Sequence, residues 1–289
     1  MRVDAHVHFW GSAELAGYGW MTPEMDSIRR SFGPEDLRGH LERHDFDRAV
    51  LVQTCPSLDE TRGYLELAAT TGFLGGVVGW VDLTDPAVAE TIAELREGPG
   101  GRYLVGIRHQ VHDEPDPDWL LRDDVRRGLR AIGEAGLAYD VLVRTRELPA
   151  ALEAVHALPE LRFVIDHIAK PPIASGELDP WAERLAALAR LAHVSCKLSG
   201  LVTEAAWKRW RAEDVMPYAS RVLEWFGEER LLFGSDWPVC TLSGSYDSVV
   251  SLAERIVGGK DERVFGGNAE RLYRLPAPDR TRLSARQRA

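Results

Sequence analysis

Apolar residues along the chain follow two alternating patterns: short β-rich runs, and longer stretches with apolar residues three or four positions apart. The short runs predict eight strands, at residues 2–9, 48–54, 75–83, 104–111, 137–143, 162–168, 193–199 and 231–236. The stretches between them predict amphipathic helices, as in Val125, Leu129 and Ile132. Eight alternating units predict an α/β fold, a single-domain (β/α)8 TIM barrel over residues 1–275. A doubly wound open sheet is the alternative, disfavoured because no glycine-rich phosphate loop follows a strand.

Loop lengths indicate which end of this barrel would carry a site. The helix-to-strand connections are short, whereas several strand-to-helix connections are long, at residues 10–33, 112–122, 169–179, 200–213 and 238–245. Long loops at the carboxyl ends of barrel strands are typical of a binding and reacting face. The arginine-rich, aperiodic segment 276–289 is expected to be a disordered tail.

Composition narrows the class of partner. The 289 residues carry a formal net charge of −10, which argues against nucleic acid or an anionic membrane as a partner. The three cysteines form no C-x-x-C pair, so a disulfide framework or a cysteine-rich zinc site is not expected. No apolar leader or membrane-spanning run is visible, and we expect a cytoplasmic protein that acts on a small molecule.

Strand parity predicts a polar barrel mouth. Asp4, His6 and His8 alternate with apolar residues in the first strand, and we expect all three to point into the barrel. The same test on the other strands gives Gln53, Trp80, Asp82, Arg108, Gln110, Asp140, His167, Lys197 and Asp236. A buried charge costs several kcal/mol unless it is paired, hydrated or metal-bound. Inward polar groups from the first strand and seven others therefore indicate a pocket.

Structural explanations remain open for several of these residues. Asp236 could cap a turn, and His167 could be a hydrogen-bonded core histidine. Lys197 could form a structural ion pair with Asp140 or Asp236, and His109 could face outward. Four tryptophans in strand-to-helix loops could line a sugar pocket or simply pack, namely Trp10, Trp20, Trp119 and Trp237.

Several segments, taken in order, resemble the amidohydrolase superfamily and its sugar-lactonase branch. They read DAHVHFW, GIRHQVHDEPDPDWL, FVIDHIAKPPI, CKLSGLVTE, FGSDWP and VFGGNAERLY, and they span nearly the whole chain. The resemblance implies a hydrolytic site at the strand carboxyl ends, with one divalent metal such as zinc or with none. The residues that match its metal ligands are His6, His8, His167 and Asp236.

Together with the polar pocket, the resemblance implies hydrolysis of a small lactone, a sugar aldono-lactone of the L-fucono- or L-rhamnono-lactone type. Asp236 would be the general base, and His6, His8 and His167 would act on the carbonyl oxygen. Substrate binding is assigned to Arg108, His109, Asp140, Lys197 and Trp237. The alternatives are a metal-dependent decarboxylase or amide hydrolase on the same barrel, and a non-catalytic carbohydrate-binding barrel. Tight zinc without lactonase activity would favour the former, and a dispensable carboxylate at position 236 the latter.

Overall fold

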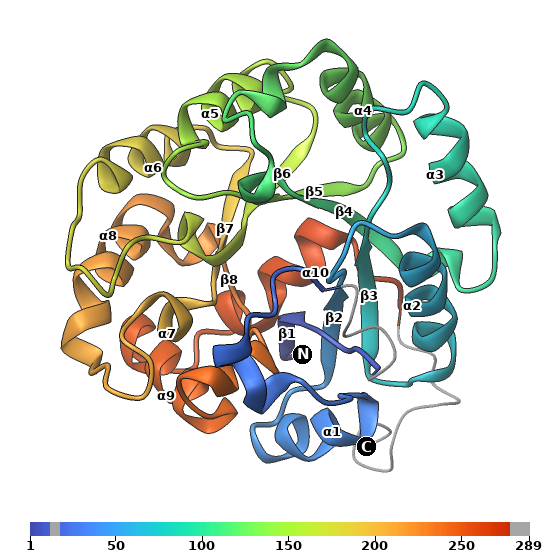
Figure 1. Ribbon diagram of the computed structural model, residues 1–289. Coiled ribbons are helices and arrows are strands. Elements are labelled where there is room, and N and C mark those ends of the chain that lie inside the picture. The colour runs from blue at the N-terminus through green and yellow to red at the C-terminus, as the bar shows by residue number, and fades with distance from the viewer. Residues whose placement is uncertain (12–17, 278–289) are drawn as a thin grey trace.

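A computed structural model describes residues 1–11 and 18–277 and forms a barrel of parallel strands (Figure 1). The eight strands follow one another around the sheet in sequence order. They are β1 (Val3–Val7), β2 (Arg48–Val52), β3 (Leu74–Gly79), β4 (Leu104–Gln110), β5 (Ala138–Leu142), β6 (Arg162–Ile165), β7 (Val194–Leu198) and β8 (Leu231–Phe233). All neighbouring pairs from β1–β2 to β7–β8 are parallel.

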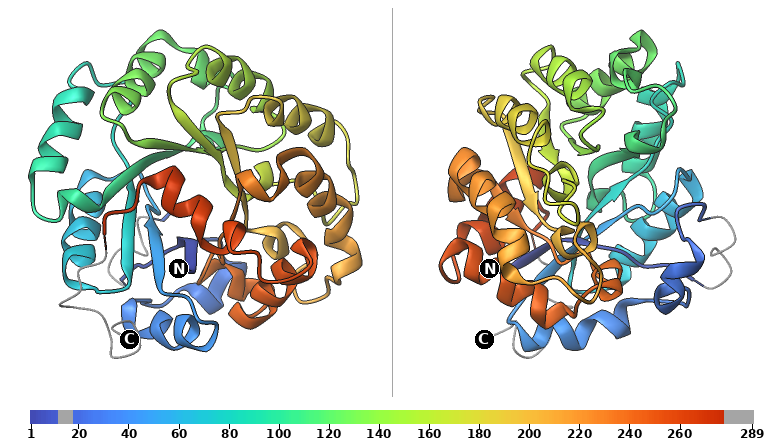
Figure 2. Two further views of the ribbon diagram at one scale, coloured as in Figure 1. Left: turned by 180° about the vertical axis from the view of Figure 1, so that it is seen from behind. Right: turned by 60° about the vertical axis from the view of Figure 1, so that its left-hand side comes forward.

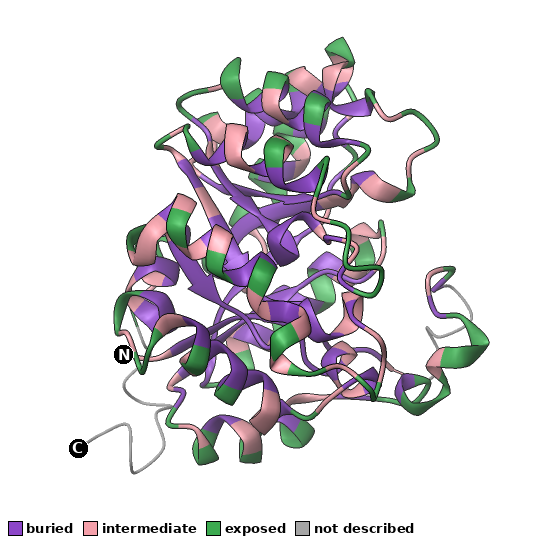
Figure 3. Ribbon diagram, turned by 90° about the vertical axis from the view of Figure 1, so that its left-hand side faces the viewer, coloured by how far each residue is buried: buried purple, intermediate pink, exposed green. Residues whose placement is uncertain are grey.

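Helices pack around this barrel and across one of its ends. They are α1 (Pro34–Arg43), α2 (Leu58–Thr70), α3 (Val88–Glu97), α4 (Asp123–Glu134), α5 (Leu148–His156), α6 (Trp181–Ala189), α7 (Leu201–Glu204), α8 (Ala212–Arg230), α9 (Tyr246–Val257) and α10 (Asn268–Tyr273). The strands are buried, and the exposed residues lie on the outer helices and loops (Figure 3). The start of α2 is fixed by an N-cap, because the Ser57 side chain accepts a hydrogen bond from the Glu60 amide.

The ring closes through residues that follow β8. The Asp236 amide donates to the His6 carbonyl at 2.9 Å, and the His8 amide donates to the Trp237 carbonyl at 2.8 Å. These bonds join the last strand segment to the first. The predicted (β/α)8 barrel is therefore confirmed, and the open-sheet alternative is wrong.

The barrel interior is apolar at one end, where α10 covers it. Alternate residues of the strands form one buried cluster with α10, comprising Val3, Ala5, Val50, Val52, Val78, Val105, Ala138, Val164, Leu232, Ala269, Leu272 and Tyr273. Seen from behind, α10 crosses this end of the barrel (Figure 2, left). The polar site must therefore lie toward the opposite, carboxyl end of the strands.

The structure corrects the prediction for Asp4. The β1–β2 register shifts between Asp4 and Val7, so strict alternation does not hold along β1. Val3 and Ala5 both face the barrel interior, while the Asp4 carboxylate accepts from the Tyr246 hydroxyl of α9 at 2.9 Å. Asp4 thus faces the helices, and His6 points inward because of the irregularity.

No helix in residues 1–11 and 18–277 is long and apolar enough to cross a bilayer. Residues 278–289, most of the expected tail, lie outside the described residues. The domain limits and the cytoplasmic location stay predictions.

Candidate active site

Four side chains meet at the carboxyl ends of β1, β6 and β8. His6 lies within β1, but His8, His167 and Asp236 come just after the strands that precede them. The predicted strands 162–168 and 231–236 were too long, because β6 ends at Ile165 and β8 at Phe233. These three functional side chains therefore sit on short loops anchored by strands, the usual place for reacting groups in this fold.

Two of these residues have left-handed backbone conformations. The φ angles are 51° at His167 and 57° at Asp236, a region that residues with a Cβ rarely adopt. Ile168, Ala169 and Lys170 continue the left-handed turn after β6. Each such residue costs about 1–2 kcal/mol, so the surrounding packing must hold the turn in place. Backbone strain is concentrated where His167 and Asp236 enter the site.

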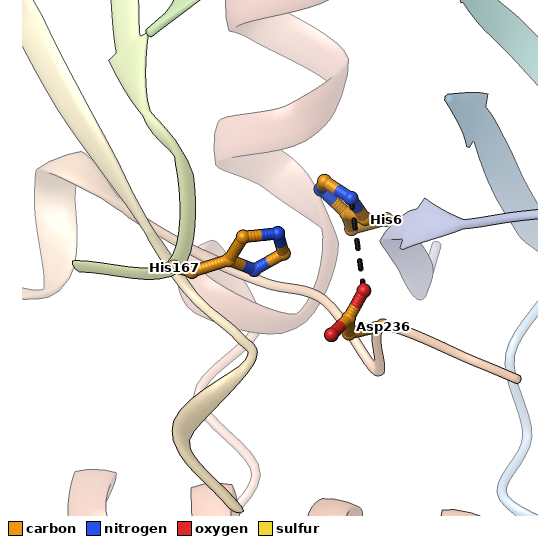
Figure 4. A group of neighbouring side chains, drawn as sticks. All are labelled: His6, His167 and Asp236. Atoms are coloured by element: carbon orange, nitrogen blue, oxygen red, sulfur yellow. Dashed lines mark ion pairs between the residues drawn. The ribbon is translucent and has the colours of Figure 1, made fainter. Parts of the chain in front are cut away.

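The Asp236 carboxylate lies within reach of the imidazoles. Its Oδ1 is 3.4 Å from His8 Nε2 and 3.9 Å from His6 Nε2, and the two Nε2 atoms are 3.1 Å apart. The His167 ring centroid lies 4.5 Å from that of His6. Figure 4 shows His6, His167 and Asp236 converging from three separate segments. Each of the four residues is at most 5% exposed.

Hydrogen bonds on the outer side of two imidazoles fix their orientation. His8 Nδ1 lies 2.8 Å from the Val52 carbonyl and must donate to it, which turns Nε2 toward Asp236. His167 Nδ1 lies 2.9 Å from the Ser199 hydroxyl. Burial lowers the pKa of His167 well below its ordinary value and favours the neutral ring. Burial would raise the pKa of Asp236, but His167 and the His8 hydrogen bond hold it below the usual carboxyl value.

A charged layer lies beneath His6. Lys197 Nζ donates to Asp140 at 2.6 Å, lies 3.0 Å from His6 Nδ1 and forms an ion pair with Asp166 Oδ1 at 3.0 Å. The Tyr273 hydroxyl donates to Asp140 at 2.9 Å from below. Burial raises the pKa of Asp140 to about 6 against the opposing effect of Lys197. Burial and the Lys197 charge keep the pKa of His6 well below its ordinary value.

Arg108 links this layer to the barrel mouth. Its Nη1 donates to Asp166 at 3.0 Å and lies 3.2 Å from His6 Nε2, and its Nη2 donates to the Gln53 side chain at 3.0 Å. Gln53 in turn donates to Gln110 at 3.0 Å. The sequence analysis did not select Asp166, although it immediately precedes His167 and pairs with both buried cations.

The predicted substrate-binding residues fall into different places. Lys197 and Asp140 are fully buried under His6, and Trp237 packs against Phe9 and Phe32 at 2% exposure. Substrate contact by these three stays a prediction that the geometry does not favour. Arg108 borders the His6 ring, and His109 is the one of the five that lines the cavity described next.

A cavity of about 470 Å³ opens over the ends of β2 and β4. Its lining consists of Tyr18, Gly19, Trp20, Thr54, Cys55, Pro56, His109, Gln110, Asp113 and Glu114. Gln110 connects it to the site, because its side chain accepts from Gln53, which bonds to Arg108. Of the four loop tryptophans, Trp20 lines the cavity, with its indole nitrogen donating to the Thr54 carbonyl at 3.1 Å.

Comparison with known proteins decides the family. The sequence model described as Amidohydrolase matches residues 3–275. The chain belongs to the amidohydrolase family. The resemblance inferred from the six motifs is thereby confirmed.

Relatives of this amidohydrolase include two curated lactonases. An L-fucono-1,5-lactonase of Burkholderia ambifaria is 44% identical over 245 residues, covering 85% of this chain and 83% of the relative. One of Burkholderia multivorans is 41% identical over 266 residues, covering 88% of each. A zinc-bound amidohydrolase structure from Burkholderia multivorans has a TM-score of 0.88 and 39% identity, covering 96% of this chain and 100% of that one.

The residues of this amidohydrolase suit a divalent cation. His6, His167 and Asp236 offer ligand atoms within 4.8 Å of one another. His8 adds its Nε2, which lies 3.4 Å from the Asp236 carboxylate, so a proton or a cation can be shared between the two groups. Nitrogen and carboxylate donors with outer hydrogen bonds, as on His8 and His167, are the set that zinc prefers.

Two glycines make room for the histidines of this amidohydrolase. A Cβ at Gly234 would lie 2.6 Å from His6 Cβ, and a Cβ at Gly200 would lie 2.7 Å from the His167 ring. Sequence reasoning missed both, although each lies in a segment that it quoted. Clearance at these positions lets His6 and His167 approach the backbone of the neighbouring strands.

Replacing Gly200 by alanine should therefore displace His167 and lower lactonase kcat/KM by about tenfold or more, since misplacement by about 1 Å can cost two orders of magnitude. Gly176→Ala is the matched control, because Gly176 also has a left-handed φ, of 77°, but no atom within 4 Å of the added Cβ. Steady-state kinetics and thermal unfolding of both variants separate the clash from the backbone strain. Equal losses in the two variants would contradict a specific role for the Gly200 clearance.

Proposed function

We propose that this amidohydrolase opens the ring ester of a small sugar lactone, of the L-fucono-1,5-lactone type, to give the open-chain acid. The observation that carries the proposal is a buried carboxylate, Asp236, that meets three imidazoles at the barrel mouth. The two lactonases at 44% and 41% identity, aligned over most of their length, support the same substrate class.

Asp236 is the general base in this proposal. Its lowered pKa keeps the carboxylate ionised near neutral pH, so it can accept a proton from a water molecule. The water oxygen then bonds to the lactone carbonyl carbon and gives a tetrahedral oxyanion. When the ring C–O bond breaks, the leaving alkoxide takes the proton back from Asp236. The net change is addition of one water molecule, and the carboxylate is restored.

The oxyanion requires positive groups that are already in place. Arg108 Nη1 lies 3.2 Å from His6 Nε2, so the guanidinium charge stands beside this imidazole. Donors held in a site that excludes water are each worth about 2.7–4 kcal/mol. Lys197 stays below His6, where it positions this ring and balances Asp140 and Asp166.

A divalent metal such as zinc would be held by His6, His8, His167 and Asp236. When bound, it would supply a Lewis acid that polarises a carbonyl or lowers the pKa of a water molecule. His8 and His167 are prepared for this role because hydrogen bonds already occupy their outer nitrogens.

Zinc should stabilise the folded chain. At free zinc one hundred times above Kd, the free energy of unfolding should rise by about 2.7 kcal/mol. His167→Ala should remove this gain, while His156→Ala, an exposed position at the end of α5, should keep it. Denaturant unfolding with and without zinc measures the difference. An unchanged gain in His167→Ala would contradict the assigned ligands.

The experiment that tests the function is a pH-indicator assay on 1,4- and 1,5-aldonolactones, run with and without chelator. We expect enzymatic opening of L-fucono-1,5-lactone well above the spontaneous rate. No turnover of any lactone, together with turnover of amides or aromatic carboxylates, would favour the amide hydrolase or decarboxylase alternative. Lactone binding without turnover would favour the non-catalytic alternative.

A further inference from the structure

The cavity beside the active site has a chemical character of its own. Two carboxylates, Asp113 and Glu114, and two aromatic rings, Tyr18 and Trp20, contribute to its wall. No lysine or arginine belongs to that lining in the described part of the chain. Such a wall offers acceptors and an apolar face, which suits a neutral ligand rich in hydroxyl groups.

Glu114 is held in one orientation at this wall. Its Oε1 lies 2.7 Å from His109 Nε2, and its side chain is 28% exposed. Within the described residues, His109 is the partner of this side chain and it contacts Oε1, which leaves Oε2 to accept from a ligand in the cavity. Arg146 donates to the Glu114 carbonyl at 2.7 Å and fixes the backbone at the same point.

His109 is in turn held by two tryptophans. The Trp80 indole nitrogen donates to His109 Nδ1 at 3.0 Å, so the proton of the neutral ring must sit on Nε2 and point to Glu114. The His109 ring stacks on Trp119 with centroids 4.3 Å apart and planes 9° apart. Burial lowers the pKa of His109, which agrees with a neutral ring. The two tryptophans therefore fix the His109 ring, and His109 in turn fixes the orientation of the Glu114 carboxylate.

We infer that Glu114 is the specificity-determining residue of this enzyme: it binds ring or side-chain hydroxyls of the lactone through Oε2 and disfavours lactones that carry a carboxylate. The inference rests on the proposed lactonase function and extends it to the part of the substrate that does not react. A carboxylate accepts hydrogen bonds from hydroxyl groups more strongly than a neutral acceptor does. It also repels a second carboxylate placed close to it.

The test compares two six-membered lactones, L-fucono-1,5-lactone and unsubstituted δ-valerolactone. Glu114→Gln should raise KM for the hydroxylated lactone by about tenfold, because it weakens a charge-assisted hydrogen bond, and should leave kcat within about twofold. Neither constant should change for δ-valerolactone, which has no hydroxyl to bind. Trp80→Phe should raise the same KM by a smaller factor, since it frees the His109 ring that aims Glu114.

Asp118→Asn is the matched control, because Asp118 is exposed in the same loop and lies outside the cavity lining. It removes the same charge and should leave both substrates unaffected. If the wild type is active and Glu114→Gln has the same ratio of kcat/KM for L-fucono-1,5-lactone to kcat/KM for δ-valerolactone, the role of Glu114 is overturned. The proposed lactonase function would then still stand. Inactivity of the wild type on both lactones would overturn the proposed function and this inference with it.

Discussion

Asp236→Asn should lower kcat/KM for L-fucono-1,5-lactone by about 10²–10⁴-fold, the range that a positioned general base contributes. The amide keeps the size of the side chain and also tolerates the left-handed backbone at position 236, where φ is 57°. It cannot accept the proton of the attacking water molecule. The loss should therefore appear in kcat, measured by initial rates over a range of substrate concentrations.

The control for this change is Asp247→Asn, which replaces a half-exposed aspartate of α9 that pairs with Arg43. It should retain wild-type kinetics. Thermal unfolding of both variants shows whether the fold is intact. Full lactonase activity in Asp236→Asn would exclude this carboxylate as the base, whatever the metal content.

Lys197→Met should lower the free energy of unfolding by about 3–5 kcal/mol, as expected when one partner of a buried ion pair is removed. Lys197 has no exposed surface, and it stands 2.6 Å from Asp140 and 3.0 Å from Asp166. Removal of the ammonium leaves Asp140 without a cation, whereas Asp166 still has Arg108 at 3.0 Å. Urea unfolding measures the change.

A second substitution tests the cause of this loss. Adding Asp140→Asn to Lys197→Met should restore part of the stability, because the remaining buried carboxylate, Asp166, stays paired with Arg108. Arg43→Met removes a cation from an exposed pair and should cost at most about 1 kcal/mol. If Lys197→Met cost no more than Arg43→Met, the charged layer would not support the fold as described.

The barrel could be predicted because the sequence pattern that specifies each strand and helix is local and occurs eight times. Each strand is a short apolar run followed by a helical period, and eight repeats leave little choice of topology. The predicted barrel also implied that its functional side chains converge, since the carboxyl ends of the strands meet at one mouth. These side chains are His6, His8, His167 and Asp236. The alternation rule wrongly placed Asp4 inside the barrel. The register shift in β1 that reverses its direction depends on the pairing with β2, which the sequence of β1 alone does not show.

Other features depend on contacts between distant segments and could not be read locally. The left-handed turn at residues 167–170 runs against the usual preference of Ile168 and Ala169, so only the surrounding packing can impose it. Trp237 was expected at the substrate but packs in the core, because sequence distinguishes poorly between the two uses of a large aromatic ring. Glu114 was not predicted as a site residue, since only its contact with the His109 ring in the folded chain distinguishes it from a surface carboxylate.

The position of Tyr273 has a consequence for how the protein is made. Its hydroxyl reaches Asp140 through the covered end of the barrel, so the last described helix seals the charged layer from water. In a nascent chain whose α10 has not yet docked, we expect Lys197 and Asp140 to stay open to water from this end of the barrel. Burial of the charged layer, and with it the fixed placement of His6, would then be completed only when α10 packs against the strands.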